Sequence, residues 1–345
     1  LGLRWDVNPA PGDANGNIPY TVDQIQDLTT TKLASQGTAL WKTTYGNFAP
    51  RVGLAYQVHQ QPGHETVLRA GAGMFYDMGN TTASQGYTGI GSVYRYFTTG
   101  PFPASQATVD SVPQPSVSTP YSVLAYGYDP NLKLPRTVQW NAALQQNLGA
   151  NQTLTLSYIG AAGRKLLLQR SYDLGAIGNP NFVPGSASSV VLTLNGASSN
   201  YDALQVQFQK RLSQGLQVLF FYTWSYSNDT KSTNLHVIPL LKDNSDFDIR
   251  TNFQAAVTYD ILAGRGSSWA TAPLRHWSID TRVSARSALP VDVNSGLSAS
   301  TVAGAAVSYH PNRVASQPLY LHDRTMPGSR QINPAAYAIA KDANG

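Results

Sequence analysis

Strict alternation between apolar and polar residues runs through Ala203–Asp229, and it limits the possible folds more than any other feature of the chain. Its clearest part is Leu204, Gln205, Val206, Gln207, Phe208 and Gln209. A period of two indicates a β-strand with one apolar and one polar face. The polar face carries neutral amides where a solvent-exposed strand usually carries lysine and glutamate. The fold therefore depends on what this amide-rich face meets.

Nine segments of the chain alternate in this way, which predicts an all-β protein. They are Leu1–Asn8, Phe48–His59, Thr66–Asp77, Thr137–Leu148, Thr153–Ile159, Ala203–Leu212, Leu216–Asn228, Arg250–Leu262 and His276–Leu289. Helical signals are weak. Val22, Ile25 and Leu28 have helical spacing, which predicts at most a short helix in a loop.

The connections between these segments alternate between short and long. The short ones are 60–65, 149–151, 213–215 and the somewhat longer 263–275; the long ones are 9–47, 78–136, 160–202 and 229–249. In an up-and-down antiparallel meander, this pattern places all short turns at one end and all long loops at the other. Such asymmetry is typical of transmembrane β-barrels, which have short periplasmic turns and long extracellular loops.

Aromatic residues mark both ends of the apolar faces. Near the long loops stand Tyr76, Trp140, Tyr158, Tyr222 and Trp224, and near the short turns stand Tyr56, Tyr259 and Trp277. Amphipathic rings favour the two membrane interfaces. If the apolar face meets lipid, the amide-rich face lines a wet lumen. We favour this barrel over a soluble carbohydrate-binding β-sandwich, which explains the alternation but neither the loop lengths nor the paired belts.

Composition excludes several other classes of protein. The chain has no cysteine, and its charged fraction is 12%, against a usual share of about 25%. A net charge of +5 without a basic block gives no sign of nucleic-acid binding. Catalytic and phosphate-binding motifs are absent, so we predict neither an enzyme nor a cofactor. We predict no metal either: the "DNSDFD" spacing does not fit an EF-hand, and Asp248 is expected to pair with Arg250.

Two sets of residues are candidates for function. An arginine on the lipid face would cost roughly 2–4 kcal/mol at the bilayer midplane, so lumen placement is the physical expectation. The predicted lumen-facing residues are Arg51, Arg69, Arg250, Arg282, Arg286, Gln205, Gln207 and Gln209. These arginines could bind an anionic solute or plug carboxylates; the alternative, which we favour, is that they balance neighbouring Asp77, Asp248 or Asp280.

The second set lies in the loop from Met78 to Pro135, which is rich in aromatic residues. The candidate ligand contacts are Tyr87, Tyr94, Tyr96, Phe97, Tyr121, Tyr126 and Tyr128, and Phe102 lies in the same loop. Aromatic faces stack on sugars and other flat ligands. The equally weighted alternative is that these rings pack the loop against itself.

Several blocks of the sequence resemble the barrel of Oar-like TonB-dependent receptors. They include "NFAPRVGLAY", "TVLRAGAGMFYD", "LPRTVQWNAALQQNLGANQTLTLSYIGAAGRKLL" and "DFDIRTNFQAAVTYDIL", in the family's order. The resemblance implies a barrel of about 22 strands around an N-terminal plug, in the outer membrane of a Gram-negative bacterium. It also implies energy from the TonB complex and an unidentified small-molecule, carbohydrate or peptide ligand.

The chain departs from that pattern by omission. It shows no plug, TonB-contacting segment, signal peptide or closing C-terminal strand. The nine predicted strands are also an odd number, whereas a bacterial barrel normally has an even number. We therefore expect residues 1–345 to be an internal part of a receptor barrel that takes up or exports a solute. A non-transporting adhesion or structural barrel is the alternative function.

Overall fold

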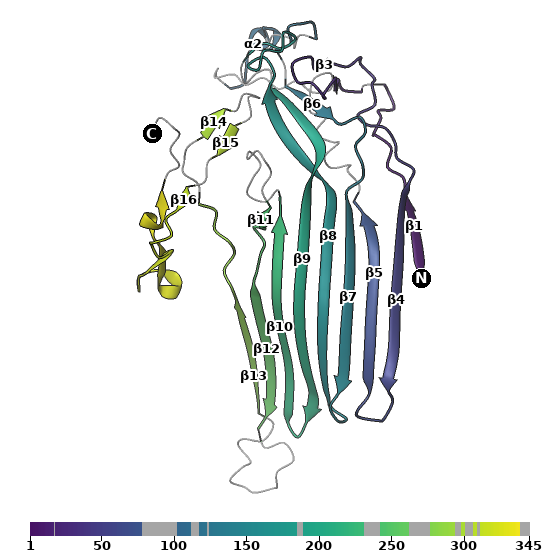
Figure 1. Ribbon diagram of the computed structural model, residues 1–345, viewed down its shortest axis with the longest axis vertical. Helices are drawn as coiled ribbons and strands as arrows, with labels where there is room; N and C mark the ends of the chain where they lie inside the picture. Colours follow the sequence, from purple (N-terminus) through teal and green to yellow (C-terminus); the bar gives the residue numbers. More distant parts are fainter. Residues whose placement is uncertain are drawn as a thin grey trace.

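The computed structural model describes residues 1–16, 18–77, 102–111, 117–122, 124–184, 189–230, 242–261, 277–293, 298–300, 306–308 and 311–338. Its main feature is an 11-stranded sheet in which nine strands, here called the wall, follow one another in sequence order. Every neighbouring pair in the wall is antiparallel. Figure 1 shows these strands side by side in one layer. The predicted meander is confirmed.

The wall strands correspond one to one with the nine alternating segments. They are β1 (Gly2–Asp6), β4 (Asn47–His59), β5 (Thr66–Tyr76), β7 (Arg136–Asn147), β8 (Gln152–Asp173), β9 (Ser189–Ser213), β10 (Leu216–Asp229), β12 (Thr251–Asp260) and β13 (Ser278–Arg286). Short turns gather at the lower end in Figure 1 and long connections at the upper end. The β9–β10 hairpin shows the local cause, because Gln214 and Gly215 both have positive φ (52° and 77°). Two consecutive residues with positive φ form a tight hairpin turn whose twist matches that of the two paired strands.

The strands β8 and β9 are longer than the sequence predicts. β8 continues to Asp173 instead of ending at Ile159, and β9 begins at Ser189 instead of Ala203. The prediction of one long loop over 160–202 is therefore wrong. The extended parts carry apolar residues on both faces, so they lack the period of two that marks a half-buried strand. Leu168, Val190 and Leu192 are buried there.

The hydrophobic core lies above the wall, in the described parts of 7–46, 117–135 and 164–198, here called the loop layer. Its strands are β2 (Val22–Asp23), β3 (Lys32–Leu33) and β6 (Ala125–Tyr128), and β6 pairs in parallel with β9. One cluster includes Val22, Phe182 and Leu192; a second contains Leu40, Trp41, Tyr128 and Leu132. The loop layer is thus a packed structure in its own right.

Asparagine side chains hold the loop layer together. Asn179 is buried, and its Nδ2 donates to the carbonyl oxygens of Leu28 and Thr31, both at 2.8 Å. This ties the connection between β8 and β9 to the segment between β1 and β4. The helix predicted around Val22 and Leu28 is wrong, because the chain there forms turns and the β2–β3 pair.

The remaining described elements are short. They are α2 (Gln106–Asp110), β11 (Asp243–Asn244), β14 (Ser298–Ser300), β15 (Ala306–Ser308), β16 (Asn312–Arg313), β17 (Tyr320–His322), η3 (Pro327–Ser329), β18 (Arg330–Ile332), η4 (Pro334–Ala336) and β19 (Tyr337–Ala338). Among the described residues, no helix has the length and hydropathy needed to cross a membrane.

Candidate functional site: the polar face and the loop pocket

Strand register gathers the predicted lumen residues on one face of the wall. Side chains directly opposite each other in an antiparallel pair point to the same face. Gln207 lies opposite Thr155 and Phe221, and Phe221 lies opposite Gln254. Traced in this way, the polar face contains Arg51, Arg69, Gln139, Asn141, Gln145, Gln205, Gln207, Gln209, Asn252, Gln254, Arg282 and Arg286.

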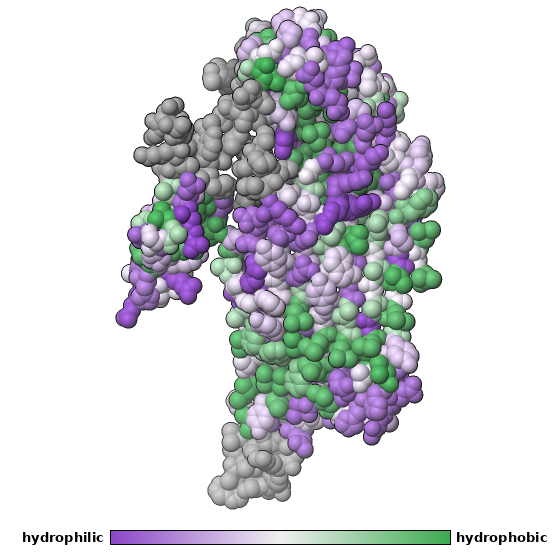
Figure 2. Space-filling model, viewed as in Figure 1, coloured by the Kyte–Doolittle hydropathy of each residue, from purple (hydrophilic) through white to green (hydrophobic). Residues whose placement is uncertain are grey.

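The same register puts seven of the eight predicted belt aromatics on the opposite, apolar face, and Trp277, two residues before Ile279 of that face, continues the same alternation. Trp140 lies opposite Ala72, and Tyr158 lies opposite Leu204, whose other partner is Trp224. Apolar-face residues are widely exposed, including Leu54 at 66% and Trp277 at 63%. Figure 2 shows hydrophobic residues gathered over the lower half of the wall, with hydrophilic residues above them. An exposed apolar surface of this extent needs a nonpolar neighbour.

The polar face is positively charged. Within the described residues, no ion pair joins Arg51, Arg69, Arg282 or Arg286 to a carboxylate. Arg51 instead places its guanidinium over the ring of Phe75, with Cζ 4.4 Å from the ring centroid. Asp280 accepts a hydrogen bond from the hydroxyl of Thr258 at 2.6 Å. Asp280 also lies on the polar face, two residues from Arg282, so it can offset part of that charge without a direct ion pair.

Arg250 differs from the other arginines. Its Nη2 lies 2.8 Å from Oδ2 of Asp248, which confirms the predicted pair. Its guanidinium also lies over the ring of Tyr226, whose register belongs to the apolar face, at 4.3 Å. Asp248 is buried, and its second oxygen accepts from the backbone N–H of Ser227 at 2.8 Å. Arg250 thus fastens the loop before β12 to the upper end of β10.

The acidic segment around Asp246 contains a carboxyl group with a shifted pKa. Burial, followed by the charges of Asp229 and Asp292, raises the pKa of Asp246. In the part of the chain that the structure describes, no cluster of three or more acidic or histidine side chains could hold a metal ion.

The loop layer contains a pocket of about 1070 Å³. Buried Leu40, Trp41 and Tyr128 form its apolar part, and the rings of Trp41 and Tyr128 lie 5.6 Å apart. Exposed Lys32, Lys42, Asp23 and Tyr45 supply charge and an open aromatic face. Thr21 also lines the pocket, and its enclosed hydroxyl lacks a hydrogen-bond partner among the described residues. The pocket can accommodate an amphipathic ligand that carries negative charge.

The predicted ligand aromatics fall into three groups. Tyr121 and Tyr128 are buried at 7% and 1% exposure, so for these two rings the structure favours packing of the loop layer. Tyr126 is half-buried against the second core cluster. The others, Tyr87, Tyr94, Tyr96 and Phe97, lie outside the described residues.

Sequence reasoning missed the pocket residues between β1 and β4. Trp41, Lys42 and Tyr45 lie close together in a long connection, and that aromatic–cationic grouping was the available signal. Their convergence with Tyr128 depends on tertiary contacts. The backbone N–H of Lys42 donates to the carbonyl of Pro130 at 2.9 Å, which joins the two segments.

Residues 1–345 match the protein family described as outer membrane beta barrel domain. The chain belongs to this family. Its wall is therefore part of an outer-membrane β-barrel, and the apolar face meets lipid. The soluble sandwich is excluded, because the family is one of outer-membrane β-barrels. No curated protein matches the chain.

The solved structures similar to this outer membrane beta barrel domain share little sequence identity with it. The FrpB iron transporter from Neisseria meningitidis (F3-3 variant) is 13% identical, over 68% of this chain and 27% of that chain, with a TM-score of 0.39. The outer membrane transporter YddB from Escherichia coli is 11% identical, over 70% and 33%, with a TM-score of 0.39. The copper transporter OprC is 13% identical, over 66% and 26%, with a TM-score of 0.32. The chain spans a third or less of these structures.

Proposed function

We propose that this chain forms part of the wall of an Oar-like, TonB-dependent transporter that carries a solute across the outer membrane. The observation that carries the proposal is the polar face, where amides accompany four arginines without a carboxylate partner in the described chain. Such a face suits a lumen that holds an acidic plug or passes an anionic solute, because either would neutralise the arginines.

Ligand capture takes place in the loop pocket. Buried Leu40, Trp41 and Tyr128 close the apolar floor of the pocket, while Lys32 and Lys42, against the single carboxylate of Asp23, favour an anionic group at the opening. An extracellular pocket above a polar lumen positions the ligand for entry. The N-terminal plug and the TonB complex would be the partners that open the path.

Further strands complete the barrel in this proposal. β1 pairs only with Asn47–Arg51 of β4, so the outer edge of β4 from Val52 to His59 has no partner in the described residues. The far edge of β13 is likewise unpaired among them. Lipid cannot satisfy exposed backbone N–H and C=O groups. The barrel wall therefore needs additional strands on both sides of this sheet.

The test measures whether TonB changes access to the polar face. Gln254 faces the lumen and its neighbour Ala255 faces lipid. In cells that make the complete protein, we expect a water-soluble maleimide to label Gln254→Cys several-fold faster when TonB is present and energised. Ala255→Cys is the matched control and should label slowly in either case. Equal labelling of Gln254→Cys with and without TonB would favour the non-transporting structural barrel.

A further inference from the structure

The strands β4 and β5 separate toward the upper end of the wall. Their pairing runs from His59 and Thr66 to Arg51 and Gly73 and stops there. Above this point β4 pairs only with β1, and β5 pairs only with β7. The separation leaves two adjoining hollows in the barrel wall.

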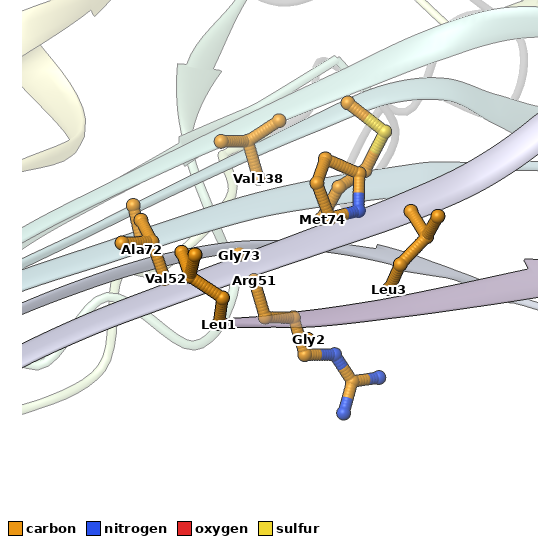
Figure 3. A pocket seen from close by; sticks show the side chains of 10 residues that line it. Leu1, Gly2, Leu3, Arg51, Val52, Ala72, Gly73, Met74 and Val138 are labelled. Atoms are coloured by element: carbon orange, nitrogen blue, oxygen red, sulfur yellow. The ribbon is translucent and has the colours of Figure 1, made fainter.

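The lower hollow is an apolar groove of about 530 Å³. Its apolar lining includes Leu3, Pro50, Val52, Ala72, Met74 and Val138. All six belong to the lipid-facing set by strand register. Figure 3 shows the guanidinium of Arg51 extending away from the other labelled side chains. The groove therefore opens on the membrane side of the wall.

The upper hollow is a polar pocket of about 230 Å³, here called the cationic pocket. Its lining includes Lys133, Arg136, Lys165, Tyr76, Thr44 and Asn47. Three cations line it and no carboxylate does. Within the described residues none of the three cations forms an ion pair, and Asp77, which follows Tyr76, forms none either. Arg164 adds a further charge directly opposite Arg136, an arrangement of like charges that destabilises a bare sheet.

The side chain of Asn195 holds the two lysines of this pocket together. Its Oδ1 accepts from the backbone N–H of Lys133 at 2.7 Å. Its Nδ2 donates to the carbonyl oxygens of Lys133 at 2.9 Å and Lys165 at 2.7 Å. Lys165 has a positive φ of 55°, a strained conformation for a residue with a side chain. The backbone is thus fixed so that both lysines reach one pocket.

The two hollows follow one another along the same face. Met74 and Val138, at the groove, form a register pair, and the next same-face pair is Tyr76 and Arg136 at the cationic pocket. The step between such pairs is about 7 Å along a strand. We propose that this composite site binds a phosphate-bearing lipid of the outer leaflet, with the phosphate in the cationic pocket and an acyl chain in the groove.

Charge and position both support a lipid as the occupant. The cationic pocket lies just beyond the aromatic belt residues Tyr76 and Trp140, at the level where lipid headgroups meet water. Stacked Trp5 and Phe48, with ring centroids 6.2 Å apart, add to the belt beside the groove. An anionic headgroup would neutralise the cations, while the groove excludes water from the chain below.

The test measures binding of a bisphosphorylated glucosamine lipid to the complete protein in detergent by native mass spectrometry. Each cation near a membrane surface contributes about fivefold. The triple variant Lys133→Gln/Arg136→Gln/Lys165→Gln should therefore bind roughly 100-fold more weakly. Ala72→Phe, which fills the groove and leaves every charge in place, should also weaken binding. Lys210→Gln is the matched control, because Lys210 lies on β9 near the short-turn end of the wall. This variant should bind the lipid with an affinity within twofold of the wild type.

Two comparison ligands separate the lipid from a free anion. The dephosphorylated form of the same lipid should bind weakly to the wild type. Its affinity should equal that of the intact lipid for the triple variant. Inorganic phosphate should fail to displace the lipid at millimolar concentration. Equal binding by wild type and triple variant, equal binding of the dephosphorylated lipid, or displacement by inorganic phosphate would each overturn the proposal.

Discussion

Replacing Tyr128 with alanine should destabilise the loop layer by about 3–5 kcal/mol, the usual loss for a buried aromatic residue. The ring is 1% exposed and packs against Trp41, Leu40 and Leu132. Removing it leaves a cavity where β6 meets the segment before β4. The close packing at Gly127 shows how little relaxation is available there, because an added Cβ would lie 2.2 Å from Cγ2 of Val22.

Hydrogen exchange measures this effect locally. In the complete protein, amides of the loop layer should lose protection in Tyr128→Ala, while those of β10 and β12 keep theirs. Phe102→Ala is the control, since Phe102 belongs to the same long connection but is 99% exposed. Unchanged protection around Tyr128 would mean that its ring does not stabilise the loop layer.

Replacing Leu156 with arginine should destabilise the barrel by roughly 2–4 kcal/mol, the cost of that charge on a lipid face at the midplane. Leu156 lies opposite Leu144 on one side and Val206 on the other, in the middle of the apolar face. The long side chain can lower part of this cost by extending toward an interface.

The neighbouring residue provides the control. Thr155 lies opposite Gln145 and Gln207 on the polar face, so Thr155→Arg should change the free energy of unfolding by much less. Both variants would be compared by urea unfolding in lipid vesicles. A larger loss in Thr155→Arg than in Leu156→Arg would reverse the assignment of the two faces.

The wall could be predicted from the sequence because one physical constraint governs it. Val206 and Gln207 face different media, so every strand that crosses the bilayer carries the same period of two. The eight belt aromatics could be placed for the same reason. Their amphipathic rings are favoured at the two membrane interfaces, which every membrane-crossing strand of the wall meets.

The loop layer could not be predicted because tertiary contacts replace that constraint. Leu168 and Leu192 are buried in strand extensions that pack against loops, and the alternation is lost there. The pocket needs Trp41 and Tyr128, which are far apart in sequence and meet through β6 and β9. The cationic pocket likewise depends on Asn195, whose hydrogen bonds to distant lysines leave no local pattern.

The face assignment underlies both proposals, and a paired cysteine experiment tests it most directly. The chain has no cysteine of its own, so Val206→Cys and Gln207→Cys each give a single labelling site within it. An environment-sensitive dye at each position would be exposed to lipid-borne and to aqueous quenchers in the complete protein. We expect lipid quenching at position 206 alone and aqueous quenching at position 207. If position 206 were shielded from both quenchers while 207 stayed open to water, the apolar face would be a protein core and the lipid-facing wall would be wrong.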